Sequence, residues 1–202
     1  MINIAVMVSG GGTNLQALID QAEAGNIPHG KIKLVLASNE KAYALERAKK
    51  HNIETAVVKR KEYDSQDAFD NAIVDTLHAH QIDMVILAGY LSILGESVIH
   101  AYQDRMINIH PSLIPSFCGK GFYGLKVHEA ALARGVKVTG ATVHYVNEIP
   151  DGGRIILQKA VEIQDGDTPE VLQKRVMEQA EWILLPKAAE MVAAKLDKEK
   201  SE

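Results

Sequence analysis

The sequence predicts an α/β fold in which helices cover both faces of a mostly parallel, twisted sheet. Two observations support this prediction. Short apolar runs alternate with amphipathic stretches over the first half of the chain, and this βαβα order is typical of parallel sheets. Apolar residues make up 47% of the 202 residues, and no repeat or linker-like stretch divides them. We therefore expect a single domain over residues 1–202.

The first predicted unit is a strand, a glycine turn and a helix. Residues 2–8 are apolar and β-branched and stop at Ser-Gly-Gly-Gly, which is typical of a buried parallel strand. Over 14–24, Leu15, Leu18 and Ile19 recur at helical spacing. The alternation then continues along the chain. Further strands are expected at 31–37, 54–58, 83–87 and 106–109, with helices at 40–51, 65–80 and 92–102.

The order changes after His110, where glycine and proline become frequent. Residues 111–124 are expected to form an irregular loop. Beyond it, the pattern predicts a short helix and two strands that are antiparallel across the Asp151-Gly152-Gly153 turn. These elements are expected at 127–134, 139–146 and 155–163. A stripe of apolar residues then predicts a helix over 169–196, and the charged tail at 196–202 is expected to fray.

Charge and composition exclude several classes of protein. The 26 acidic residues outnumber the 22 basic ones, for a net charge of −4, so a nucleic-acid partner is not expected. No apolar run reaches the ~18 residues of a membrane span, and the first residues lack the charged leader of a signal peptide. The single cysteine, Cys118, cannot form an intrachain disulfide. We expect a cytoplasmic protein without a membrane partner.

The glycine turn has two interpretations. Gly10, Gly11 and Gly12 allow close approach of a phosphate, and the amides at a helix start favour anions. Thr13 and Asn14 could cap the helix and donate to an oxygen. The turn lacks the Gly-Lys-Ser/Thr of a Walker loop and the third small residue of a dinucleotide fingerprint. The simpler interpretation is a tight turn between strand and helix.

Polar residues lie at the C-terminal end of the fifth predicted strand. Asn108 and His110 are two residues apart, so they share one face of the strand, and ligands of open α/β sheets bind beyond the carboxyl ends of strands. An amide can donate to a developing oxyanion and an imidazole can move a proton. Alternatively, both side chains bond to loop backbone.

Asp151 in the later turn could be paired with His110. The carboxylate would then raise the pKa of the imidazole and orient its ring, whereas the simpler interpretation is a turn aspartate that bonds its own backbone. His110, His128, His144 and Asp151 lack the spacing of metal ligands, so no metal is expected. Cys118 lacks a recognisable activating context for a nucleophile.

Four motifs, taken in order, resemble one enzyme family. They are Val8-Ser-Gly-Gly-Gly-Thr-Asn-Leu-Gln, Leu87-Ala-Gly-Tyr-Leu-Ser-Ile-Leu, Asn108-Ile-His-Pro-Ser-Leu-Ile-Pro-Ser-Phe and His144-Tyr-Val-Asn-Glu-Ile-Pro-Asp-Gly-Gly. The chain resembles the phosphoribosylglycinamide formyltransferases over essentially its whole length. The Asn-x-His and Asp-Gly-Gly set marks the wider folate-dependent formyltransferases, and the glycine loop indicates the glycinamide ribonucleotide branch.

The resemblance implies a Rossmann-like formyltransferase fold and a function in de novo purine synthesis. The enzyme would move a formyl group from its co-substrate 10-formyltetrahydrofolate to the amine of glycinamide ribonucleotide. Asn108 and His110 would stabilise a tetrahedral intermediate, and Asp151 would orient His110 and a water. Glu181 would contact the ribose. The phosphate is expected at Gly11, Gly12, Thr13 and Asn14, and the folate pterin at Leu91, Ser92, Ile93, Leu94 and Val146.

Some residues depart from the family pattern. Trp182 and Leu185 stand where a histidine and a tyrosine are usual, and the loop from Cys118 to His128 is longer than the common form. These changes affect substrate contacts at the loop rather than the chemistry. The partners are expected to be small molecules, and a monomer or a homodimer is compatible with the sequence.

Other functions agree less well with the sequence. A methionyl-tRNA formyltransferase would need a further C-terminal domain and basic surface, and a formyltetrahydrofolate hydrolase an N-terminal regulatory domain; neither is expected here. A nicotinamide oxidoreductase would use the glycine loop but would leave Asn108, His110 and Asp151 without a shared purpose. A nucleotide-sensing module would not require a proton-transfer histidine.

Overall fold

The computed structural model describes residues 1–202 and contains one seven-stranded sheet with the order β3-β2-β1-β4-β5-β6-β7. The first five strands run parallel, while β6 pairs antiparallel with both β5 and β7. The strands are β1 Ile2–Val8, β2 Gly30–Ala37, β3 Glu54–Val57, β4 Met84–Leu87, β5 Met106–His110, β6 Val138–Tyr145 and β7 Ile155–Glu162. The mostly parallel α/β sheet is confirmed.

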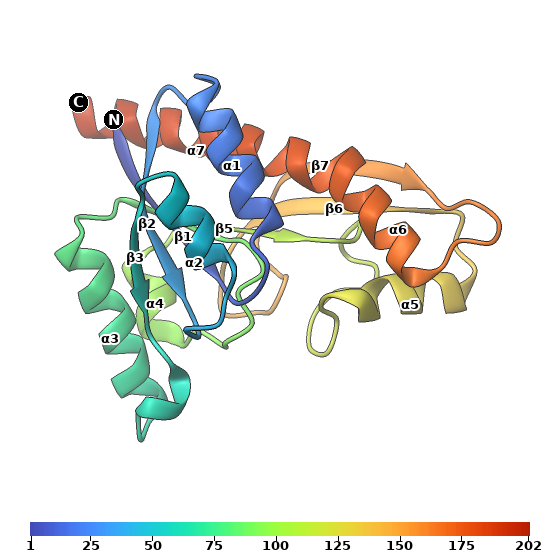
Figure 1. Ribbon diagram of the computed structural model, residues 1–202, viewed down its shortest axis with the longest axis horizontal. Coiled ribbons are helices and arrows are strands. Elements are labelled where there is room, and N and C mark those ends of the chain that lie inside the picture. The colour runs from blue at the N-terminus through green and yellow to red at the C-terminus, as the bar shows by residue number, and fades with distance from the viewer.

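Helices cover both faces of this sheet (Figure 1). They are α1 Thr13–Glu23, α2 Ala44–Lys50, α3 Gln66–Ala79, α4 Glu96–Ala101, α5 Leu125–Arg134, α6 Pro169–Val176 and α7 Trp182–Ser201. In strand β1, successive side chains point to opposite faces of the sheet and so enter two separate hydrophobic clusters. Its Ile4 and Val6 join the cluster under α1, α2, α6 and α7, whereas Met7 joins the cluster under α3 and α4. None of the helices is long and apolar enough to cross a membrane.

Two helices begin later than expected because side chains form hydrogen bonds with the backbone of the preceding residues. Helix α2 begins at Ala44 rather than at residue 40, since the Asn39 side chain accepts a hydrogen bond from the amide of Lys41 and donates to the carbonyl of Ser9. Helix α4 begins at Glu96 rather than at residue 92. Side-chain bonds of this kind compete with helix formation.

The C-terminal segment differs from one regular helix in two respects. A π-helical turn, Met177–Glu181, lies between α6 and α7. Helix α7 also continues to Ser201, through the tail that was expected to fray. Two ion pairs fasten this end: Asp197 pairs with the amino group of Met1, and Lys200 reaches Asp83 at 2.9 Å. The two ends of the chain consequently lie side by side (Figure 1).

The glycine turn joins β1 to α1 and packs against α2. Gly12 caps α1 in the left-handed conformation, with φ of 72°. A Cβ at Gly12 would lie 2.6 Å from the Cβ of Ala44, whereas a Cβ at Gly11 would meet nothing within 4 Å. The side chains of Thr13 and Asn14 do not cap the helix. Of the adjacent glycines, Gly12 is therefore required by the fold, while Gly11 faces open space.

Alanine substitutions at Gly11 and Gly12 should separate these two roles. Gly12→Ala should cost about 1–2 kcal/mol for the left-handed backbone alone, in addition to the clash with Ala44. For a chain of this size each kcal/mol lowers Tm by roughly 2–4 °C. Gly11→Ala should leave Tm nearly unchanged. Thermal unfolding followed by circular dichroism measures both, and equal Tm values for the two variants would contradict this account of the turn.

Candidate active site

Three segments meet at the carboxyl end of β5. Strand β5 supplies Asn108 and His110, β6 supplies His144, and the β6–β7 turn supplies Asp151. In the antiparallel pairing of β5 with β6, Asn108 lies directly opposite His144. The structure therefore brings together the three residues expected from the sequence and adds His144 to them.

The amide group of Asn108 is held by two acceptors. Its Nδ2 donates to Nε2 of His144 at 3.1 Å and, over a longer 3.5 Å, to Oδ1 of Asp151. His144 can accept because its Nδ1 donates to the carbonyl of Tyr145 at 2.7 Å, which leaves Nε2 with a lone pair. The amide nitrogen therefore points at the cluster, and the long contact to Asp151 is the one most easily exchanged for another acceptor.

His110 lies behind this amide and is almost fully buried. Its Nε2 donates to the carbonyl of Phe117 at 2.9 Å, and its Nδ1 lies 3.5 Å from Oδ2 of Asp151. A carbonyl can only accept, so Nε2 carries a proton in both charge states of the ring. The proton that the ring gains or loses is therefore on Nδ1, facing Asp151.

Asp151 connects the turn to the irregular loop. Its Oδ2 accepts from the amide of Gly119 at 2.8 Å, and its backbone is left-handed, with φ of 56°. The two glycines after it are required by space: a Cβ at Gly153 would lie 1.7 Å from the carbonyl oxygen of Tyr145, and one at Gly152 would lie 2.6 Å from Ile149. The Asp-Gly-Gly sequence thus forms a tight turn from which one carboxylate reaches the Gly119 amide, His110 and Asn108 together.

The pKa of His110 differs in direction from the sequence prediction. Burial lowers this pKa below its ordinary value, and the neighbouring imidazole of His144 adds to the effect. Asp151 and the Phe117 carbonyl act in the opposite direction but do not offset burial. The sequence shows the possible ion pair but not the loss of water around the ring. His110 is accordingly a neutral base at neutral pH.

Asp151 remains ionised beside it. Burial alone would raise the pKa of Asp151, yet its pKa lies below the ordinary value because His144, His110 and the Gly119 amide favour the carboxylate. The cluster therefore combines a neutral imidazole with a carboxylate that can stabilise a proton arriving on Nδ1.

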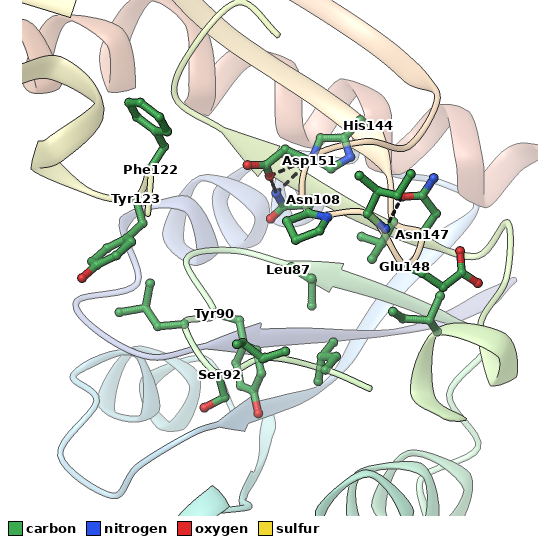
Figure 2. A pocket seen from close by; sticks show the side chains of 17 residues that line it. Leu87, Tyr90, Ser92, Asn108, Phe122, Tyr123, His144, Asn147, Glu148 and Asp151 are labelled. Atoms are coloured by element: carbon green, nitrogen blue, oxygen red, sulfur yellow. Dashed lines mark hydrogen bonds and ion pairs between the residues drawn. The ribbon is translucent and has the colours of Figure 1, made fainter. Parts of the chain in front are cut away.

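A cavity of about 490 Å³ opens beside this cluster. Figure 2 shows Asn108, His144 and Asp151 together on one wall, with Tyr90 and Ser92 across from them. The lining is largely apolar and includes all five residues expected for the pterin, which are Leu91, Ser92, Ile93, Leu94 and Val146. Phe122 and Tyr123 of the longer loop also line it. The sequence had left the role of this loop open.

The 91–95 segment of this cavity is held from two sides. The amide of Leu91 donates to the hydroxyl of Ser9 at 2.8 Å, so the segment is tied to the end of β1. The amide of Gly95 donates to Asp70 at 3.1 Å, and Asp70 is buried in α3. These bonds hold the segment along the cavity in an irregular, non-helical conformation.

The residues expected at the ribonucleotide form a second group. Gly11, Gly12 and Thr13 lie at the start of α1, and Asn14 donates from Nδ2 to Oε2 of Glu181 at 2.7 Å. The side chain of Asn14 is therefore turned toward the expected ribose residue. Burial raises the pKa of Glu181 to about 6. The π turn places this carboxyl group opposite α1, and such turns occur frequently at functional sites.

Several groups at the site were not singled out from the sequence. His144 was weighed only as a metal ligand, although its register with Asn108 follows from the antiparallel pairing. The Phe117 carbonyl and the Gly119 amide carry no side-chain signal at all. Cys118 lies between them, and burial raises the pKa of its thiol, which disfavours the thiolate.

Comparison with known proteins identifies relatives of this chain. Residues 2–188 match the model of the formyl transferase family. The chain is 43% identical to the bovine trifunctional purine biosynthetic protein adenosine-3 over 192 residues, which are 95% of this chain and 18% of that protein. It is 41% identical to the phosphoribosylglycinamide formyltransferase of Haemophilus influenzae, covering 89% of this chain and 82% of that one.

Solved structures agree with these matches. The structure of glycinamide ribonucleotide transformylase 1 from Symbiobacterium toebii superposes with a TM-score of 0.90 at 40% identity, covering 96% of this chain and 89% of that chain. The phosphoribosylglycinamide formyltransferase from Bacillus halodurans gives a TM-score of 0.88 at 38% identity and covers 96% of each chain. The chain spans only 18% of the bovine and human trifunctional relatives.

The charge of Asp151 can be tested through the titration of His110. Asp151→Asn keeps the size of the side chain and an acceptor for Gly119 but removes the charge that raises the pKa of His110. The pKa of His110 should fall further, because burial then acts with less opposition. NMR titration of the ring in both proteins measures the shift. An unchanged titration would mean that the two side chains are not coupled.

Proposed function

The chain belongs to the formyl transferase family, and we propose that it transfers a formyl group from 10-formyltetrahydrofolate to the amine of glycinamide ribonucleotide, a step of purine biosynthesis. The observation that carries this proposal is the convergence of three side chains: Asn108 and Asp151 line one wall of the cavity, and His110 lies buried behind them, facing Asp151. The names of the relatives, which are formyltransferases of this ribonucleotide, support the choice of substrates.

The cavity suits the pterin of the folate. Its apolar lining would pack on the ring faces, and the backbone of the 91–95 segment offers polar groups at the edge. The folate supplies the formyl carbon, which would have to lie near Asn108 and His110.

Asn108 and His110 would act on different reacting groups: Asn108 on the formyl oxygen and His110 on the amine proton. As the amine adds to the formyl carbon, negative charge develops on the formyl oxygen, and Asn108 can turn its Nδ2 from Asp151 toward that oxygen. The amine loses a proton, which His110 accepts on Nδ1, where the carboxylate of Asp151 stabilises it. The carbon–nitrogen bond to the folate then breaks, and the proton held on His110 passes to the leaving folate nitrogen, which returns the imidazole to its neutral form.

The ribonucleotide would be held by the group at α1 and the π turn. Backbone amides at the start of α1 would donate to the phosphate, in the field of the helix. Glu181 would accept hydrogen bonds from the ribose hydroxyls. With a pKa of about 6, it is mostly ionised at pH 7.5 and loses its charge as the pH falls below 6.

The proposal is tested by following the folate spectrum with and without the acceptor. Formyl loss should require glycinamide ribonucleotide and should produce its formylated form in equal amount. Formyl loss that ignores the ribonucleotide would point to a hydrolase instead. No formyl loss under any condition would contradict the proposed function altogether.

The role of Asn108 is tested by removing its amide. Asn108→Ala should reduce kcat on the order of 10²–10³, as does the loss of an oxyanion donor elsewhere, while both KM values stay close to those of the wild type. Asn71→Ala makes the same chemical change at an exposed position of α3 and should leave kcat unchanged. Nearly full kcat in Asn108→Ala would remove this residue from the mechanism.

A further inference from the structure

Arg47 of α2 donates to the backbone of the glycine turn. Its Nε donates to the carbonyl oxygen of Gly11 at 2.8 Å, and its Nη1 donates to Oε1 of Gln16 at 3.1 Å. The guanidinium also lies over the ring of Tyr43, 5.1 Å from its centroid. Gln16 and Tyr43 therefore fix the guanidinium plane, and Nε is directed at one backbone oxygen.

The hydrogen bond from Arg47 to the Gly11 carbonyl also orients the N–H group of Gly12. In a trans peptide the C=O of one residue and the N–H of the next point in opposite directions, and the only cis peptide of this chain is Ile114–Pro115. With the Gly11 oxygen held toward Arg47, the N–H of Gly12 must point away from α2. The amide of Ala44 does the same for the preceding peptide, because it donates to the Gly10 oxygen at 3.1 Å.

The amides fixed in this way have no partners of their own. None of the backbone N–H groups of Gly11, Gly12, Thr13 and Asn14 donates a hydrogen bond within the protein. A Cβ on Gly11 would meet nothing within 4 Å, so the space on this side of the turn is open. The turn therefore presents a row of free donors, and Arg47 bonds to its opposite side.

We propose that Arg47 is a positioning residue of the phosphate site, which it orients and polarises through the Gly11–Gly12 peptide without touching the ligand. This inference rests on the proposed function, since it takes the phosphate of the ribonucleotide as the ligand of these amides. A charged donor on a carbonyl strengthens the N–H of the same peptide as a donor, because hydrogen bonds in series polarise one another. The cation also lowers the cost of bringing a phosphate dianion to the turn.

Polarisation of the Gly11–Gly12 peptide requires the hydrogen bond from Arg47, whereas a general attraction for the phosphate requires only a positive charge nearby. Lys50 is a control that separates these two effects. Lys50 lies on the same helix, with its Nζ 5.9 Å from the centroid of the same Tyr43 ring. It forms no hydrogen bond to the glycine turn. Lys50→Gln and Arg47→Gln therefore remove one positive charge each from the same surface, but only the second removes the bond to Gly11.

The experiment measures ligand binding to the full-length protein by calorimetry with ribose 5-phosphate, together with both KM values in the formyl-transfer assay. Arg47→Gln should weaken ribose 5-phosphate binding and raise the ribonucleotide KM by about 10-fold or more, the effect of losing a charged hydrogen bond. The folate KM should change less than about twofold. Arg47→Lys keeps the charge but cannot make both contacts, so it should give an intermediate loss. Lys50→Gln should match the wild type.

Three results would overturn the proposal. They are unchanged ribose 5-phosphate binding in Arg47→Gln, full rescue by Arg47→Lys, and an equal loss in Lys50→Gln. Thermal unfolding identifies a variant whose fold is damaged, and the lysine variant then decides the question. Calorimetry does not depend on turnover. If the wild-type protein binds ribose 5-phosphate but transfers no formyl group, the proposed function is contradicted, and the binding of the Arg47 variants still tests the role of Arg47.

Discussion

The carboxylate of Asp151 is the point on which the candidate site depends. It accepts the amide of Gly119, faces Nδ1 of His110 and receives the longer contact from Asn108. One partly buried charge therefore joins the end of β5, the 111–124 loop and the β6–β7 turn. Since an unpaired buried carboxylate is costly, each of these segments is held where it satisfies part of that charge.

The sheet topology explains why these partners meet. The parallel strands β1, β4 and β5 end at one edge of the sheet, which brings the glycine turn, the 91–95 segment and the Asn108–His110 pair to the same side. The change to antiparallel pairing at β6 returns the chain to this edge, so the β6–β7 turn covers it. An ionised carboxylate and an amide then line one apolar cavity, and a neutral imidazole lies buried behind them.

The elements and site residues that depend on local sequence patterns could be predicted from the sequence. Short apolar runs located every strand, helical spacing placed α1, α3 and α5 within two residues of their bounds, and the motifs indicated Asn108, His110 and Asp151. The π turn at Met177–Glu181 was not predicted. The late start of α4 could not be predicted either, because it depends on the tertiary hydrogen bond of Gly95 to Asp70. The direction of the His110 pKa shift was wrong for the same reason: a sequence shows charges but not burial. The contacts of Phe117 and Gly119 involve only backbone atoms.

The central claim is that the Asp151 carboxylate anchors the 111–124 loop as well as the imidazole. Hydrogen exchange of the Gly119 amide tests it most directly. In Asp151→Asn an acceptor remains and asparagine tolerates the left-handed backbone, so protection should persist. In Asp151→Ala the acceptor is gone, and exchange should accelerate by about 10-fold, as expected for the loss of a hydrogen bond to a charged group. Equal protection of Gly119 in Asp151→Ala and the wild type would contradict the account.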